Sequence, residues 1–187
     1  MYQQLVGKLI YVSHTKPDIA FAVSVVSQYM HDPHQGHLDA VYRILRYLKQ
    51  SSYKGLLFKK TEDRSIQVFI YADWAGSIDD RQLTSGYCTM IWENLITWRS
   101  KKHNVVARSS VEAEFRAMAH GIFQHDRTKH VVVDRYFIKE KIENNIIKIK
   151  HVNTGQQLAD ILIKGLSEKT FNYLLNKLGL IDIYHPA

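Results

Sequence analysis

The sequence predicts an α/β fold in which helices come first, a run of strands follows, and helices return at the end. Apolar residues recur at helical spacing through the first fifty residues. After Gly55 they change to alternation and to short apolar runs. Hydrophobic residues make up 45% of the 187 residues, which is enough for a packed core. We therefore expect one large domain over residues 55–187, preceded by a helical segment over residues 1–54.

The helical segment should contain three helices. Their apolar residues fall on one side of each helix when the chain is wound at 3.6 residues per turn. The second helix has further start signals, because Pro17 suits a first helical turn and the carboxylate of Asp18 suits the positive end of a helix dipole. We expect these helices over residues 2–14, 17–31 and 37–50.

The third helix has a basic outer face formed by Arg43, Arg46 and Lys49. Lys101 and Lys102 add a second basic cluster at the end of a predicted strand. The chain has 25 Lys and Arg residues against 18 Asp and Glu residues, a net charge of +7. A basic surface favours polyanions such as nucleic acid, although charged faces also serve simply to solvate a protein. We keep both interpretations and treat these five residues as candidate nucleic-acid contacts.

Four strands should follow the helices. Their sequences alternate or form short apolar runs, and three of them succeed one another closely enough to pair in antiparallel fashion. Glu93 and Asn94 form a plausible hairpin tip between the last two. We expect strands over residues 55–60, 66–73, 84–92 and 95–102.

The rest of the chain should fold mainly into helices, with one further strand over residues 145–152. Gly165 and Gly179 lie at the ends of the last two helices, where glycine commonly caps the C-terminus. The expected helices cover residues 109–122, 127–143, 155–166 and 169–180.

Several classes of protein are excluded. A single cysteine, Cys88, permits no internal disulfide and no thiolate zinc site. No apolar run approaches the ~18 residues of a membrane span. The N-terminus has neither the basic region nor the cleavage site of a signal peptide, so we expect a cytoplasmic or nuclear protein. Glycine-rich phosphate loops and a glycine-flanked serine nucleophile are missing from the sequence.

Three carboxylates occupy positions that suit a metal ligand. Asp73 stands at the end of an apolar strand, where it serves either as a turn residue or as a ligand. Glu114 borders the apolar stripe of its helix, whereas Glu112 points away more fully. Asp160 lies in the first turns of a late helix, at an apolar margin. If Asp73, Glu114 and Asp160 converge, their carboxylate oxygens suit Mg²⁺.

Longer motifs resemble one family. YADWAG, ITWRSKKHNVVARSSVEAEFRAMA and LADILIKGL are similar to the ribonuclease H domain of copia-type LTR retrotransposon Pol polyproteins. LVGKLIYVSHTKPDIAFAVSVVSQYMHDP and AVYRILRYLKQSSYKGLLF resemble the end of the reverse transcriptase that precedes it. The resemblance covers nearly the whole chain. It implies a thumb-like and connecting segment over residues 1–54 and a ribonuclease H-like mixed sheet flanked by helices over residues 55–187.

The resemblance also implies an activity, the hydrolysis of RNA in RNA–DNA hybrids during reverse transcription. By motif, Asp73 matches the family's first metal aspartate, Glu114 its helix glutamate and Asp160 its last aspartate. Two Mg²⁺ ions about 4 Å apart then activate a water and stabilise the leaving oxygen. The implied partners are an RNA–DNA hybrid or another nucleic acid, and the rest of the retroelement polyprotein.

The chain departs from the family pattern near residues 120–126. The family places a central strand with a fourth carboxylate after the glutamate helix, and RAMAHGIFQHDRTKH leaves no room for it. Asp126 is no substitute for this carboxylate, since it belongs to the sequence that follows that strand in the family. The resemblance therefore implies an internal deletion of some tens of residues. We expect a catalytically impaired domain that holds at most one Mg²⁺ well. The alternative is a decayed, non-enzymatic basic fragment that binds nucleic acid weakly or has no function.

Overall fold

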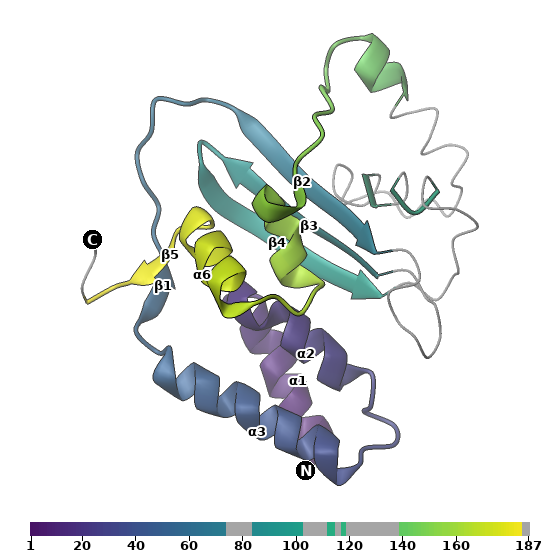
Figure 1. The fold of residues 1–187 in the computed structure, drawn as a ribbon, viewed down its shortest axis with the longest axis vertical. Coiled ribbons are helices and arrows are strands. Elements are labelled where there is room, and N and C mark those ends of the chain that lie inside the picture. Colours follow the sequence, from purple (N-terminus) through teal and green to yellow (C-terminus); the bar gives the residue numbers. More distant parts are fainter. Residues whose placement is uncertain (74–83, 103–111, 115–116, 119–138, 185–187) are drawn as a thin grey trace.

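The computed structural model describes residues 1–73, 84–102, 112–114, 117–118 and 139–184 (Figure 1). A group of helices lies beside an antiparallel sheet, and a short C-terminal segment crosses the face of that sheet. The mixed α/β character predicted from the sequence is confirmed. No helix in this part of the chain combines the length and the apolar character that a membrane crossing requires.

The three predicted N-terminal helices are present, and the second begins with a short 3-10 turn at Pro17. They are α1 (Tyr2–Ser13), η1 (Pro17–Ile19) with α2 (Ala20–Ser27), and α3 (Gln35–Gln50). Their apolar faces meet in one core, made by Tyr2, Val6, Leu9, Ile19, Val23, Val26, Val41 and Ile44. Packing of these faces, more than helix propensity, stabilises helices of this length.

Polar contacts attach the helices to the rest of the molecule. Asp18 is buried, and its Oδ2 accepts a hydrogen bond of 2.8 Å from the Tyr47 hydroxyl. Lys16 Nζ donates to the backbone carbonyls of residues 51 and 54. Trp98 Nε1 donates to the carbonyl of Ser13 at 2.9 Å, which joins the end of α1 to the sheet. The Asp18–Tyr47 bond thus joins η1 to α3, whereas the bonds of Lys16 to residue 54 and of Trp98 to Ser13 join the helical segment to strands.

The predicted antiparallel succession of three strands is confirmed. The sheet order is β2 (Ile66–Asp73), β3 (Thr84–Ile91) and β4 (Asn94–Lys102). Phe69 pairs with Cys88, and Asp73 pairs with Thr84. Among the described strands of this sheet β2 and β4 lie at the edges, and β3 lies between them.

The hairpin between β3 and β4 turns one residue earlier than predicted. Its tip is formed by Trp92 and Glu93, whose φ angles of 52° and 60° match the left-handed region that tight two-residue hairpins need. Asn94 instead pairs with Ile91 as part of β4. Its side chain also makes two bonds to the backbone of Lys59, which explains why it belongs to the strand rather than to the tip.

A small second sheet was not predicted. The strand expected over residues 55–60 is shortened to β1 (Lys54–Leu56), which pairs with β5 (Leu180–Asp182). The strand expected over residues 145–152 is wrong, because that segment has no regular structure. Ile146 and Ile149 are 66% and 57% exposed there, so its apolar alternation faces no neighbouring layer in the described part of the chain.

The helix expected over residues 155–166 is also wrong. The chain forms two short 3-10 helices instead, η2 (Thr154–Gln156) and η3 (Leu158–Leu162). Gly165 accordingly caps no helix, and its φ lies outside the left-handed region. The last helix is confirmed as α6 (Glu168–Lys177), and Gly179 follows it at φ 79° as a C-terminal cap requires.

Two expected helices lie mostly outside the described residues. Of the helix over 109–122, residues 112–114 and 117–118 are described and helical. Of the helix over 127–143, residues 139–143 are described and helical. The segment 120–126, where the sequence indicates a deletion, lies outside the described residues.

Gly86 lets η3 lie directly on the sheet. η3 contacts all three strands, and its apolar residues enter the core together with Cys88 and Met90. A Cβ atom at Gly86 would stand 2.7 Å from Ile163 Cγ2 and 3.3 Å from Leu162 Cβ. A separation of 2.7 Å is essentially never seen for a real Cβ atom, and 3.3 Å is tighter than most, so a larger residue at Gly86 would push η3 away from β3.

Replacing Gly86 with valine should therefore destabilise the protein. We expect a loss of about 1–3 kcal/mol, measured by urea unfolding, because the added atoms overpack the contact. Gly7→Ala is the control, since Gly7 lies within α1 and no atom approaches its position within 4 Å. That change should stabilise α1 by up to about 1 kcal/mol. Equal stability of Gly86→Val and the wild type would show that η3 does not pack here.

Candidate functional site

Asp160 is held at the centre of η3 and is 1% exposed. Its neighbours Leu158 and Ile161 anchor the turn in the core. Gln157 fixes the start of the turn, since its Oε1 accepts a bond from Ala159 N and its Nε2 donates to the carbonyl of Ile70 at 3.1 Å. Packing and these two bonds therefore place the Asp160 carboxylate against β2, although carboxylates are rarely buried without a partner.

The partner of Asp160 is Lys164, one turn later in the chain. The Lys164 ammonium donates to Asp160 Oδ2 at 3.2 Å and lies 3.2 Å from Oδ1. It also lies 3.8 Å from the centroid of the Tyr71 ring, on β2. The Asp160 side chain is 2% exposed and the Lys164 side chain 25% exposed, so the lysine reaches this position from the surface.

Burial and charge shift both groups of this pair. The pKa of Asp160 is raised: burial is the largest cause, the nearby Lys164 opposes it, and the negative charge of Asp73 adds to it. Burial by itself would lower the pKa of Lys164, but Tyr71 and Asp160 more than offset this, and the pKa is raised. Lys164 is thus an ammonium ion at neutral pH, and Asp73 and Asp160 are close enough to repel each other.

Asp73 is the last residue of β2 and is partly exposed. The preceding residue, Ala72, packs against the buried Ala113. This contact brings the helical residues 112–114 beside the end of β2. The strand end, η3 and this helical turn are therefore the three elements that meet around Asp73.

Glu114 does not follow the expected orientation. It is exposed, whereas Glu112 is partly buried, the reverse of what the sequence predicted. The reason is that the buried side of this turn runs through Ala113 and Ala117, four residues apart, which turns Glu114 outward. The predicted stripe through Phe115 falls outside the described residues.

The described carboxylates do not fit the magnesium centre that the resemblance implies. Asp73 and Asp160 are electrostatically coupled, and Glu114 faces solvent. Within the described residues no three His, Cys, Asp or Glu side chains stand close enough together to hold a metal ion. The roles of Asp73, Glu114 and Asp160 as catalytic metal ligands stay a prediction.

The candidate basic contacts differ in their exposure. Arg43, Arg46 and Lys49 are all exposed along α3, and Lys101 is exposed on β4. Lys102 is partly buried, and its Nζ donates to Gln28 Oε1 at 2.8 Å, so it is engaged within the protein. Arg43, Arg46 and Lys49 form a row of basic side chains on α3, which we call the α3 basic stripe.

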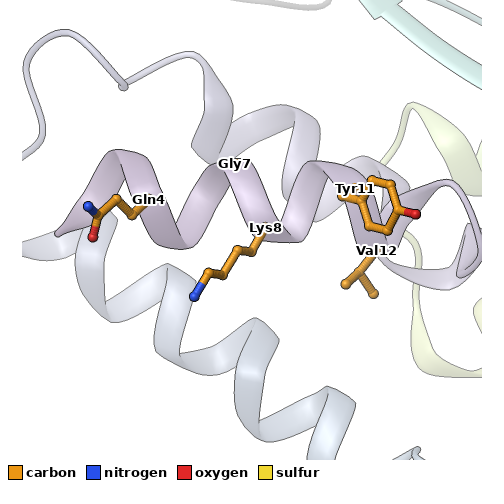
Figure 2. A pocket seen from close by; sticks show the side chains of 5 residues that line it. All are labelled: Gln4, Gly7, Lys8, Tyr11 and Val12. Atoms are coloured by element: carbon orange, nitrogen blue, oxygen red, sulfur yellow. The ribbon is translucent and has the colours of Figure 1, made fainter.

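A separate hollow lies on α1. It has a volume of about 770 Å³ and is lined by Gln4, Gly7, Lys8, Tyr11 and Val12 (Figure 2). Its lining contains one ionisable amine and one phenol but no carboxylate. The hollow therefore has neither the acidic groups of a metal site nor a contact with Asp160.

Sequence reasoning missed Lys164 and Tyr71. Two signals were available. Asp160 and Lys164 have the i, i+4 spacing of a helical ion pair. Tyr71 precedes Asp73 by two residues, so the side chains of Tyr71 and Asp73 lie on the same face of β2. Neither signal identifies burial, which only the packing of η3 reveals.

Comparison with known proteins identifies the family. The chain is 34% identical, over 97% of its length, to the retrovirus-related Pol polyprotein from transposon RE1 of Arabidopsis thaliana. It is 30% identical, over 96% of its length, to the corresponding polyprotein from transposon TNT 1-94 of Nicotiana tabacum. The chain belongs to the copia-type retrotransposon Pol polyproteins. It spans about 15% of the length of these relatives. Neither a family model nor a solved structure matches it.

The match to one long relative contains positions that this Pol chain lacks. The match to the RE1 polyprotein extends over 219 positions, whereas 97% of 187 residues is about 181 residues. About 38 positions of the match therefore face no residue of this chain. The difference is of the size that the sequence motifs indicated.

A shorter relative matches part of this Pol chain. A mitochondrial protein of Arabidopsis thaliana is 41% identical over 118 positions, which correspond to 63% of the chain and 49% of that protein. Because 63% of 187 residues is about 118 residues, this match has almost no gap in the Pol chain. The deletion expected near residues 120–126 stays a prediction.

Asp160→Asn should raise the melting temperature of the Pol chain at pH 7 by roughly 2–4 °C. The raised pKa of Asp160 means that its contribution to stability is full below the unfolded value of about 3.8 and is lost as pH rises through the folded value. The variant's advantage should therefore shrink as the pH falls toward 4. After the change, the partly exposed Lys164 can turn to solvent, so no buried charge remains unpaired.

Asp63→Asn is the control, for which we expect the opposite change in melting temperature. Hydrogen bonds from Ser65 lower the pKa of Asp63, so its contribution is present above the unfolded pKa and lost as the pH falls. Removing that carboxylate should lower the melting temperature at pH 7. A melting temperature of Asp160→Asn that lies below the wild type at pH 7 would contradict a costly buried carboxylate.

Proposed function

We propose that this chain is the remnant of a ribonuclease H-like domain of a copia-type Pol polyprotein, and that it binds nucleic acid without cutting it. The observation that carries the proposal is the ion pair of Asp160. Its carboxylate is already neutralised by Lys164 at 3.2 Å, in a core where a second cation would have to displace the lysine.

Hydrolysis by the mechanism that the resemblance implies needs two divalent ions held by bridging carboxylates. Two such ions repel strongly, and only enough anionic oxygen makes the pair tolerable. The described residues bring together Asp73 and Asp160, and the charge of one of these is already matched. We therefore derive no hydrolytic step, and cleavage of RNA–DNA hybrids should stay near background.

Binding to nucleic acid is supported by charge. The chain carries a net charge of +7, and the α3 basic stripe places Arg43, Arg46 and Lys49 at three-residue spacing on one exposed side of a 16-residue helix. Lysine and arginine side chains that replace counterions along a phosphate backbone give affinity without sequence preference. RNA–DNA hybrid is one polyanion of this kind, and other segments of the Pol polyprotein are the proposed protein partners.

One experiment tests both parts of this proposal. A fluorescent RNA–DNA hybrid is incubated with the full chain and Mg²⁺, and binding and strand cleavage are measured together. We expect binding at ~50 mM salt that weakens steeply toward ~200 mM, as counterion release requires, and no cleavage above a protein-free sample. A triple variant in which glutamine replaces Arg43, Arg46 and Lys49 should have a less steep slope of log binding constant against log salt concentration, by up to about 3.

The control variant replaces Lys60, Lys148 and Lys150 with glutamine. These lysines are exposed, so the variant has the same net charge as the first but keeps the α3 basic stripe. It should retain most of the salt dependence. The binding part of the proposal fails if affinity ignores salt or if both variants lose it equally. The catalytic part fails if the wild type cuts hybrids with Mg²⁺ and Asp73→Asn stops it.

A further inference from the structure

When it is ionised, the carboxylate of Asp160 requires a positive charge beside it. The residue is 1% exposed, and Oδ1 accepts no hydrogen bond of suitable geometry within the described structure. A buried, ionised carboxylate without a counter-charge is strongly unfavourable, so Asp160 either takes up a proton or stays ionised with a cation beside it. This need is independent of any activity.

Lys164 supplies that charge from within the chain. Its ammonium lies 3.2 Å from both oxygens of Asp160, so it occupies the space in front of the carboxylate where another cation would bind. The Tyr71 ring faces the ammonium at 3.8 Å and offers the negative face of its π-system. Asp73, at the end of the same strand, adds a second negative charge to the surroundings.

We propose that Lys164 is a built-in counter-cation that takes the place of a metal ion at Asp160, and that removing its charge turns Asp160 and Asp73 into a site for one divalent cation. An ammonium and a divalent ion in contact with the same carboxylate repel each other, so the two exclude one another. A hard divalent ion prefers carboxylate and water oxygens, which this place offers once the lysine is gone.

This inference deepens the proposed function, because it gives a reason why the wild-type chain would not hold an ion at Asp160. It concerns metal binding rather than cleavage, and the two can fail separately. Hybrid cleavage by the wild type would overturn the proposed function. The role of Lys164 is judged by metal titration alone.

The test is a titration of the full chain with Mn²⁺, in which free Mn²⁺ is measured by electron paramagnetic resonance. Lys164→Met should bind one Mn²⁺ at least about tenfold more tightly than the wild type does. Lys164→Arg retains the charge and should behave like the wild type. Lys169→Met is the matched control, because it removes an exposed lysine five residues away and should leave Mn²⁺ binding unchanged.

The double variant Asp160→Asn, Lys164→Met links the bound ion to Asp160. It removes both charges, so it should fold and should lose the tight Mn²⁺ site. Binding that persists in this double variant would show that the ion sits elsewhere and would overturn the proposal.

Thermal unfolding keeps the test decisive if Lys164→Met folds poorly. That variant leaves Asp160 buried and unpaired, so its melting temperature should drop, and Mn²⁺ should raise it again. Mn²⁺ should leave the melting temperature of Lys169→Met and of the double variant unchanged. The proposal is overturned if Mn²⁺ neither binds more tightly to Lys164→Met nor restores its fold while the double variant is folded.

Discussion

The direct contact of η3 with β3 at Gly86 is the constraint on which the rest of the site depends. Because Gly86 has no side chain, Ile163 and Leu162 can lie where a Cβ would otherwise stand. Gln157 holds the same turn against β2 through the carbonyl of Ile70. With η3 fixed in this way, Asp160 is buried. Its ionised form needs a cation beside it, and the ammonium of Lys164 lies within 3.2 Å.

Local sequence patterns predicted the elements whose stability is local, and failed where the tertiary environment decides. The three N-terminal helices and the antiparallel strands follow from apolar periodicity, which reports one buried face per element. The same logic failed for LADIL, because all five of its residues, Asp160 included, are buried, so no periodicity separates an α-helix from a 3-10 turn. It failed for residues 145–152 because alternation shows that a strand could form and not that a neighbouring strand exists to pair with it.

The candidate site was predicted in part. The motifs brought attention to Asp73 and Asp160, and the charge of one raises the pKa of the other, as two approaching carboxylates should. The orientation of Glu114 could not be predicted, since a shift of one residue in the buried stripe of a helix turns a side chain by about 100°. Lys164 was missed because an Asp and a Lys four residues apart usually form a solvated surface pair, worth little. Burial changes that pair into the feature that determines what Asp160 can bind.

We propose that Lys164, and not a metal ion, neutralises Asp160. A crystal structure of the full wild-type chain grown with Mn²⁺, with anomalous diffraction recorded at the manganese absorption edge, tests this. We expect no anomalous peak at Asp160 and the Lys164 ammonium in contact with both carboxylate oxygens. A manganese peak coordinated by Asp160, with Lys164 turned toward solvent, would show that the proposal is wrong.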